Sequence, residues 1–421
     1  MVSLFFILLA LTQVPTGQGD TKSARAFSGA KVAKPSATVA LGIDNLFESE
    51  AFRLMEGKRI GLVTNASGVD RHLVSTRLRL KRDRRVSLVQ LFAPEHGLDG
   101  VAPAGKALKD SIDQQTGLPV QSLFGRQRAP TKKALAGVDV LVFDIQDIGS
   151  RTYTYASTMG ECMVRAKEVG IPFVVLDRPN PLGGVRFEGP VLPAKRFGFL
   201  GWGPTPVSHG MTMGELARFF NDTKRIGADL YVVRMTGWKR DMLWDDTGLN
   251  WVQTSPAIPQ RLNAYLYIAT GMVGGVSKNV NEGYGTTSPF ERIGAEFITD
   301  PYAFTDAMNR AGLPGVRFIP VIYRPSYSRF KGKTLMGTQL VVTDPDLFEP
   351  LRTALTLLTE LERIYPGETV FRRWTFNAIW GDPQIMRDVQ AGKQPAEIIA
   401  KWEKGLKEFD VSRRRALLYS E

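Results

Sequence analysis

Residues 138–155, VDVLVFDIQDIGSRTYTY, decide the fold class of this 421-residue chain. They open with an apolar run, residues 138–143, which has the length of a buried strand and is too short for a typical helix. Polar and aromatic side chains follow within a few residues: Asp144, Asp147, Arg151 and Tyr153. Ligands bind beyond the carboxyl ends of strands in open α/β sheets, so this pattern predicts one wall of a binding site. Alternatively, Asp144 caps the next helix and Asp147 pairs with Arg151.

Similar apolar runs alternate with helical patterns through the first part of the chain. Further strands are expected at residues 59–64, 86–92, 172–176 and 230–235. Helices are expected at residues 44–55, 72–82, 132–136, 158–169 and 213–226. Strands that alternate with helices indicate an α/β fold, here a Rossmann-like parallel sheet with helices on both faces. Four strands end in polar residues that should meet at one edge of the sheet: Asn65, Glu95, Asp144 and Asp177.

The pattern changes after about residue 255, where Pro256 and Pro259 interrupt it. Residues 271–285 are rich in glycine, and their polar side chains include Lys278, Asn281, Glu282 and Tyr284. Strands near residues 316–322 and 338–343, a helix at about 347–364 and two closing helices are expected to follow. The sequence therefore predicts a Rossmann-like domain at residues 39–255 and a second, smaller α+β domain at residues 256–421.

The N-terminal residues 1–11, MVSLFFILLAL, are apolar and are followed by small and polar residues. This pattern is typical of a secretory signal peptide within residues 1–26, although the usual basic residue before the apolar run is missing. The run is shorter than a membrane-spanning helix, so no stable membrane insertion is expected after processing. The sequence thus predicts a secreted or periplasmic protein, with a low-complexity tether at about residues 20–38.

The net charge of +12 and pI of about 9.7 favour an acidic partner. The basic residues are spread along the chain, and no nucleic-acid-binding motif accompanies the short clusters at 81–85 and 413–415, so we expect no nucleic-acid partner. An anionic polymer or a carboxylate-bearing sugar fits the charge as well. Cys162 is the only cysteine, which excludes an internal disulfide and suggests a small core residue on a helix.

Motifs for several other chemistries are absent. The chain lacks GxGxxG after its first strand, GxxxxGK[ST] and GxSxG, so we expect neither a nucleotide cofactor nor a serine-elbow hydrolase. Three histidines without HExxH argue against a transition metal, while a hard cation at Asp144 and Asp147 is less easily excluded. The remaining carboxylates, with arginine and aromatic neighbours, suit glycoside hydrolysis, for which Tyr153, Tyr155 and Trp202 are candidate sugar-stacking surfaces.

The segment Pro94-Glu95-His96-Gly97 is the strongest candidate for acid chemistry. A carboxylate on a tight turn after a buried strand can be partly withdrawn from water, as a general acid requires. The alternative is an ordinary turn whose glutamate caps a helix.

Several strings together resemble the bacterial exo-β-N-acetylmuramidases, glycoside hydrolase family 171, formerly a domain of unknown function. The resemblance covers about residues 41–419, and it rests mainly on GLVTNASGVD, LFAPEHGLDG, VDVLVFDIQDIGSRTYTY, VLDRPNPLGG, HGMTMGELA and WEKGLKEFDVSRRRALLY. It implies a Rossmann-like catalytic domain, a C-terminal domain that completes the cleft, and release of N-acetylmuramic acid from the non-reducing end of peptidoglycan fragments.

The resemblance maps the catalytic glutamate of the family onto Glu95. Asp144 or Asp147 would then be the second carboxylate or would orient the acetamido group of the substrate, and Arg151 and Arg178 would bind its lactyl carboxylate. The other candidate substrate-binding residues are Asn65, His96, Tyr153, Asp177, Asn281 and Tyr284.

The second half departs from the family pattern. Tyr284 stands where an arginine is usual, and Gly274-Gly275 stand where an acidic segment is usual. These changes touch the C-terminal wall of the cleft and motivate two alternatives: a non-catalytic binder of wall sugars and a hydrolase of another anionic glycan.

Overall fold

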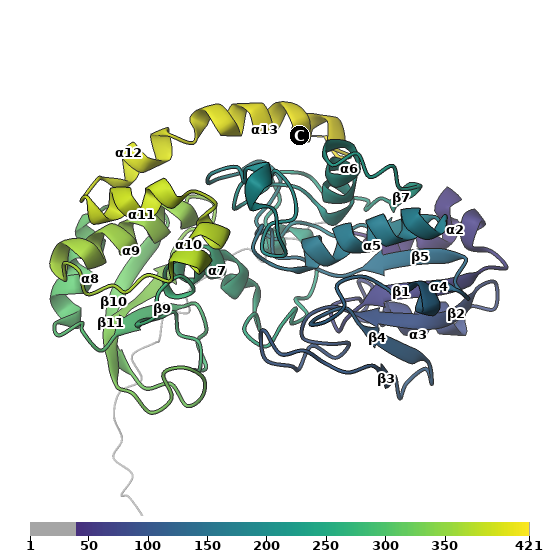
Figure 1. The fold of residues 1–421 in the computed structure, drawn as a ribbon, viewed down its shortest axis with the longest axis horizontal. Coiled ribbons are helices and arrows are strands. Elements are labelled where there is room, and N and C mark those ends of the chain that lie inside the picture. Colours follow the sequence, from purple (N-terminus) through teal and green to yellow (C-terminus); the bar gives the residue numbers. More distant parts are fainter. Residues whose placement is uncertain (1–38, 421) are drawn as a thin grey trace, which may run out of the picture. The chain divides into compact units, whose positions relative to one another are not determined.

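Two β-sheets organise the part of the chain that the computed structural model describes, residues 39–420 (Figure 1). The signal peptide and the tether that the sequence predicts lie outside these residues. In chain order, the last strand of the larger sheet is Leu230–Val233, and the first strand of the smaller sheet is Val280–Asn281. The predicted domain boundary near residue 255 falls in the segment between these two strands.

The larger sheet has seven strands in the order β3-β4-β2-β1-β5-β6-β7. Their bounds are β1 Arg59–Thr64, β2 Ser87–Ala93, β3 Ser111–Ile112, β4 Pro119–Ser122, β5 Val140–Asp144, β6 Phe173–Leu176 and β7 Leu230–Val233. All paired neighbours are parallel except β3, which runs antiparallel to β4. The α/β fold predicted from the sequence is confirmed, whereas β3 and β4 were not predicted.

Side chains alternate between the two faces of the sheet, and each face is covered by helices. On β5, Val140 and Val142 pack into one apolar cluster, while Leu141 and Phe143 pack into another. The first cluster includes side chains of α1 (Gly42–Asn45), α2 (Glu50–Met55) and α3 (Thr76–Arg82). The second includes those of α4 (Lys132–Leu135), α5 (Tyr155–Val169) and α6 (Met213–Thr223). Burial on both faces explains why β5 reads as a continuous apolar run.

Several helix boundaries differ from those the sequence predicts. The helix expected at residues 44–55 is broken into α1, a 3-10 turn at Leu46–Glu48 and α2, because the Ser49 hydroxyl caps a new start by accepting the Phe52 amide. Helix α3 begins only at Thr76, and α5 begins at Tyr155, before the expected start. Cys162 lies fully buried on α5, as expected.

The smaller sheet has four antiparallel strands in the order β10-β11-β9-β8. Their bounds are β8 Val280–Asn281, β9 Arg292–Ala295, β10 Val316–Tyr323 and β11 Leu335–Val342. Helices α7 (Arg261–Gly274), α8 (Pro301–Arg310) and α9 (Pro350–Ile364) pack against it or against one another. A second, smaller α+β unit is therefore present, but α7 and α8 were not predicted.

The chain closes with four helices rather than the expected two. They are α10 (Arg373–Trp380), α11 (Pro383–Gln390), α12 (Pro395–Ala400) and α13 (Glu403–Ala416). Helix α13 returns to the first half of the chain and packs against α6, as Figure 1 shows in yellow. Arg218 of α6 donates to the Ala416 and Leu417 carbonyls and fixes this return.

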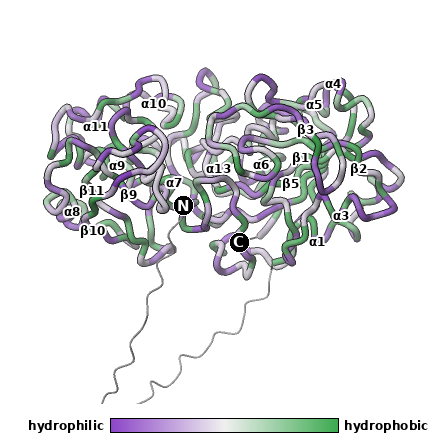
Figure 2. The backbone as a smooth tube through the Cα atoms, turned by 90° about the horizontal axis from the view of Figure 1, so that it is seen from below, coloured by the Kyte–Doolittle hydropathy of each residue, from purple (hydrophilic) through white to green (hydrophobic). Residues whose placement is uncertain are grey.

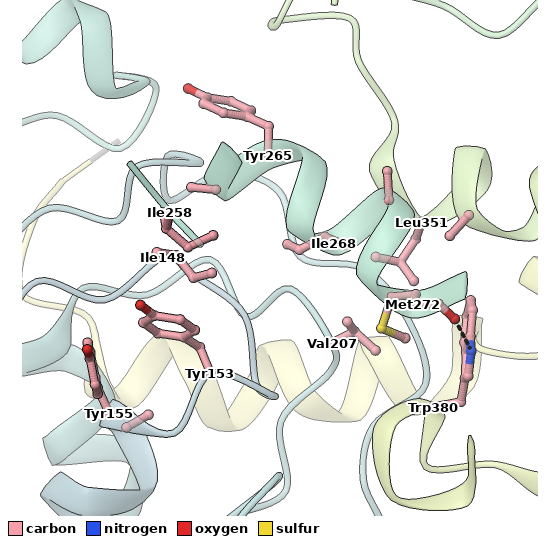
Figure 3. Packing of buried hydrophobic residues seen from close by; sticks show 14 of the residues in the cluster. Ile148, Tyr153, Tyr155, Val207, Ile258, Tyr265, Ile268, Met272, Leu351 and Trp380 are labelled. Atoms are coloured by element: carbon pink, nitrogen blue, oxygen red, sulfur yellow. Dashed lines mark hydrogen bonds between the residues drawn. The ribbon is translucent and has the colours of Figure 1, made fainter. Parts of the chain in front are cut away.

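Hydropathy follows the layers of the fold. In Figure 2 the strands β1 and β5 are largely green, while many connecting loops are purple. Figure 3 shows that the larger apolar cluster continues from Tyr155 and Tyr153 through Ile258 to Met272 and Trp380, so it joins both halves of the chain. The Trp380 indole N–H donates to the Met272 carbonyl at 3.0 Å. No helix within residues 39–420 is long and apolar enough to cross a membrane.

Candidate active site

Two adjoining cavities meet at Glu95. The inner chamber has a volume of about 290 Å³, and residues of both halves of the chain line it, among them His96, Tyr153, Tyr267, Glu282 and Tyr284. The outer chamber has a volume of about 600 Å³, and its lining includes Phe124, Arg128, Lys195, Arg196, Phe199 and Trp374. The two chambers share Glu95, Thr154 and Leu200. A ligand that occupies both chambers would therefore lie beside Glu95.

The Glu95 side chain is held from two sides. It follows β2 on a tight turn that the Gly97 amide closes by donating to the Pro94 carbonyl. Glu95 Oε1 accepts the Gly105 amide at 2.8 Å, and Oε2 accepts the Thr154 hydroxyl at 2.7 Å. Only 9% of the residue is exposed. The carboxyl group is thus fixed in orientation at the boundary between the chambers.

His96, next to Glu95, lies in the left-handed backbone region, with φ of 71°. Its Nδ1 lies 2.7 Å from the Ala102 carbonyl, which can only accept, so Nδ1 carries a proton. Nε2 is then the ring nitrogen left for a ligand. A non-glycine residue with positive φ is uncommon and is found most often where the structure needs a particular side-chain position.

A second carboxylate, Glu282, lines the inner chamber from the C-terminal half. Its Oε2 atom is shielded from solvent and accepts no hydrogen bond, and the nearest cationic atom is Arg329 Nη2 at 3.6 Å. Burial raises the pKa of Glu282, and Arg329 partly opposes this rise. Gly274 makes room for the carboxylate, because a Cβ atom at that position would collide with Glu282 Oε2.

Four aromatic side chains line the inner chamber: Tyr153, Tyr267, Tyr284 and Phe290. The Tyr153 ring contacts the Tyr155 and Tyr267 rings edge-on, with centroids 4.7 and 5.9 Å apart. Tyr267 contacts Phe290 in the same way at 5.0 Å. Figure 3 shows Tyr153, Ile258 and Met272, which all line this chamber. Apolar ring faces with a few polar groups are typical of a sugar-sized site.

The outer chamber is more exposed and more basic. Arg128 stacks over the Phe199 ring, with its guanidinium carbon 3.8 Å from the centroid, and it also lies 5.1 Å from the Phe124 centroid. Trp374 is 78% exposed. Lys195 is exposed and Arg196 is half-buried. Glu95 is the only acid among the residues that line this chamber.

Asp144 lies at the end of β5 but is fully buried. Its Oδ1 accepts Arg178 Nε at 2.5 Å, and its Oδ2 accepts Arg178 Nη2 at 2.9 Å and the Thr76 hydroxyl at 2.5 Å. Neither Asp144 nor Arg178 lines the inner or outer chamber. The two side chains neutralise each other, so the geometry offers neither a catalytic carboxylate nor a free binding arginine.

Asp177 follows β6 and is also fully buried. Two amides, of Arg178 and Gly214, donate to Oδ1, and two hydroxyls, of Thr212 and Tyr419, donate to Oδ2. Burial raises its pKa to about 7. Asp177 therefore anchors the C-terminal segment. Glu95, Asp144 and Asp177 all follow parallel strands at the same edge of the sheet, as the sequence predicts, but neither aspartate lines the inner or outer chamber.

Asp147 and Arg151 do not form an ion pair with each other. Asp147 Oδ1 accepts the Gly149 amide at 2.7 Å and lies 3.9 Å from His209 Nε2. The Arg151 guanidinium donates to three backbone carbonyls, those of Pro190, Thr205 and Ile379. Burial lowers the pKa of Arg151 to about 9. Arg151 thus joins loops of the first half to helix α10 and has no carboxylate partner among the described residues.

Asn65 and Asn281, which were predicted to bind substrate, hold loops in place. Asn65 Oδ1 accepts the Ser67 amide and hydroxyl. Asn281 Oδ1 accepts the Gly283 amide and the Tyr323 hydroxyl, and its Nδ2 donates to the Tyr284 carbonyl. Asn281 therefore positions the turn that carries Glu282 and Tyr284.

The structure brings four of the predicted residues together in the inner chamber: Glu95, His96, Tyr153 and Tyr284. Seven others line neither chamber: Asn65, Asp144, Asp147, Arg151, Asp177, Arg178 and Asn281. Thr154 and Glu282 were not among the site residues predicted from the sequence. Glu282 could have been found from the sequence, because it is the one acid in the glycine-rich segment 271–285. Within residues 39–420, no group of three or more His, Cys, Asp or Glu side chains could hold a metal ion.

Comparisons with known proteins agree on one family. Two family models match, the N-terminal domain of exo-β-N-acetylmuramidase NamZ over residues 60–262 and its C-terminal domain over residues 265–419. The chain is 44% identical over 382 residues to the peptidoglycan β-N-acetylmuramidase NamZ of Bacillus subtilis strain 168, covering 90% of this chain and 91% of that protein.

Two solved structures of DUF1343 family proteins from Bacteroides fragilis share the fold. One has a TM-score of 0.83 and 36% identity, covering 91% of this chain and 99% of the other. The second has a TM-score of 0.73 and 25% identity, covering 91% of this chain and 100% of the other.

Proposed function

Since this chain belongs to the exo-β-N-acetylmuramidase NamZ family and is therefore a glycosidase, we propose that it releases N-acetylmuramic acid from the non-reducing end of peptidoglycan fragments. The observation that carries this proposal is the position of Glu95. Its carboxyl group lies where the inner and outer chambers meet, with the two oxygens held by separate donors. A glycosidic bond that spans the two chambers would lie beside a proton donor.

Glu95 serves as the general acid and base in this proposal. The Gly105 N–H can only donate, so Oε1 must remain an acceptor. The Thr154 hydroxyl can donate to a carboxylate and can accept from a carboxylic acid, so it matches both protonation states of Oε2. Of the two oxygens, Oε2 is therefore better placed to carry the proton that Glu95 gives to the leaving oxygen.

Glu282 takes the role of second carboxylate that the sequence analysis gave to Asp144 or Asp147. It lines the inner chamber with Glu95 and is half-buried. A carboxylate on this wall can orient the group that attacks the anomeric carbon, either water or the acetamido group of the sugar. Asp144 does not suit this role, because Arg178 and Thr76 occupy its oxygens.

The inner chamber holds the sugar that is released. Its walls include the buried or half-buried aromatic side chains Tyr153, Tyr267 and Phe290, against which a pyranose ring can pack. Because the outer chamber contains the exposed residues Lys195 and Trp374, the chain of the substrate extends through it toward solvent. This arrangement suits removal of one terminal sugar at a time.

The test is to incubate the full chain with digested peptidoglycan and to measure free N-acetylmuramic acid by mass spectrometry. We expect release by the wild type and by Glu408→Gln, a matched control on the exposed face of α13, but none by Glu95→Gln. A wild-type protein that binds these fragments without releasing a sugar would contradict the proposed activity and would support the non-catalytic alternative.

A further inference from the structure

The outer chamber carries an excess of positive charge that catalysis at Glu95 does not require. Arg128, Lys195 and Arg196 line it, and Glu95 at the shared wall is the only acid among its lining residues. None of these three cations has an acidic partner in the structure of residues 39–420. Three cations without a counter-ion beside one cavity favour an anionic ligand there.

Arg128 is oriented for such a ligand. Its guanidinium group stacks on Phe199 and lies near Phe124, and these two rings are 6.0 Å apart. Stacking uses the flat face of the guanidinium group and leaves the N–H groups at its edge, which match a carboxylate in a two-pronged hydrogen bond. Because the aromatic rings restrict the side chain, less conformational entropy is lost when the ligand binds.

Other groups in the outer chamber suit a sugar. Trp374, with 78% of its surface exposed, offers a ring face at the chamber. Asn377 also lines the chamber and is half-buried. An exposed aromatic side chain together with an amide side chain suits a hydroxylated ligand, so the chamber has contacts for both a sugar and an acid.

We propose that the outer chamber binds the leaving portion of the glycan and selects substrates in which this portion bears a carboxylate. This inference rests on the proposed function, because the inner chamber must hold the released sugar for the outer chamber to hold the remainder. The carboxylate lies beyond the bond that is cleaved, on a second acidic sugar or on an acidic substituent. Arg128 binds it, and Lys195 and Arg196 add attraction at the rim.

The experiment uses two synthetic glycans that differ only in the leaving portion, where one carboxyl is free or is converted to its methylamide. The ratio of their kcat/KM values is measured for the full chain. We expect the wild type to prefer the free acid, Arg128→Gln to lower this ratio about tenfold, and Lys195→Gln/Arg196→Gln to lower it roughly two- to fivefold. The matched control is Lys81→Gln/Arg82→Gln, an adjacent and exposed Lys-Arg pair on α3, which should keep the wild-type ratio.

The two proposals fail in different ways. If the Arg128→Gln variant lowers kcat/KM for both glycans by the same factor, the outer chamber does not recognise the carboxylate of the leaving portion. That result would overturn this inference but would leave the proposed glycosidase activity unaffected. If no preparation cleaves either glycan, the proposed function fails. Calorimetry can then still test the inference by measuring how both glycans bind to the Glu95→Gln chain. The inference requires that the free acid binds more tightly than the methylamide. It also requires that this preference is lost when Arg128→Gln is added.

Discussion

The carboxyl edge of the large sheet holds acids in two different environments. Asp144 and Asp177 are fully buried, and their oxygens are occupied by Arg178, by backbone amides and by hydroxyls. Glu95 follows a strand of the same sheet but reaches a cavity, with one donor on each oxygen. All three acids thus lie at the ends of strands, and the partners of each carboxylate distinguish the two buried structural acids from Glu95, the acid that we propose for catalysis.

The most severe test of this comparison is Glu95→Gln. The amide keeps the side-chain shape, its oxygen can accept the Gly105 amide, and its NH₂ can donate to the Thr154 hydroxyl, so the fold should persist. It cannot deliver a proton, and we expect release of N-acetylmuramic acid from peptidoglycan fragments to fall by about 10²–10⁴-fold. Steady-state kinetics beside a melting curve measure both effects. Wild-type turnover in this variant would move the chemistry away from Glu95.

Asp144→Asn tests the role of a fully buried acid at the same edge of the sheet. It leaves the buried Arg178 without a counter-ion, and breaking a buried pair costs on the order of 3–5 kcal/mol of unfolding free energy. The matched control is Asp139→Asn, just before the same strand, where the pair with Arg59 is exposed and should contribute no more than about 1 kcal/mol. Urea unfolding compares the two variants. A folded Asp144→Asn protein with a 10²-fold loss of turnover would instead assign Asp144 a part in the chemistry.

The fold class could be predicted because the strands are buried on both faces. Residues 59–64 were predicted as a strand and form β1 with the same bounds, and the apolar run at 138–143 overlaps β5. Helix α7, RLNAYLYIATGMVG, was missed because most of its residues are buried, so its sequence has no polar face to reveal a helical period. Glycines at 271 and 274, and Gly275 directly after the helix, also suggested a loop.

The site could be predicted only in part, because a sequence does not show which partner a side chain will find. Glu95 and His96 were found through the turn that follows a strand. Asp144 looked equally suitable, yet its partner Arg178 lies 34 residues away and joins it only in the folded chain. The basic outer chamber was not predicted at all, since its cations come from separate loops.

The pH dependence of stability gives a third way to test the comparison. Burial raises the pKa of Asp177 from the ordinary 3.8 to about 7, so the folded state binds this proton more tightly than the unfolded state does. The resulting stabilisation is complete below about pH 4 and is lost as the pH rises through about 7, an effect on the order of 4 kcal/mol.

Asp177→Asn isolates this contribution. The asparagine oxygen can accept the two amides, and its NH₂ can donate to the hydroxyls of Thr212 and Tyr419, so the variant imitates the protonated acid. Thermal unfolding between pH 4 and pH 8 should show the variant gaining stability relative to the wild type as the pH rises. A constant difference between the two proteins would mean that Asp177 keeps its ordinary titration in the fold.

The smallest effect concerns Thr154, which we expect to position Glu95 rather than to contact the bond that breaks. Thr154→Val keeps the shape of the side chain but removes the hydroxyl that binds Glu95 Oε2. The helix start is not disturbed, because the Thr154 side chain makes no capping hydrogen bond to α5. Losing one hydrogen bond to a charged group costs about 1.5 kcal/mol, so kcat should fall about tenfold while KM changes little.

Thr154→Ser is the matched control, since it restores the hydroxyl without the methyl group and should recover most of the lost kcat. A purely structural role for Thr154 would give a different pattern: both variants would lower the melting temperature, and kcat and KM would change together. If Thr154→Val retains full turnover, the Gly105 amide alone orients Glu95. In that case Glu95 would differ from Asp144 only in its single backbone donor and in its access to the cavity.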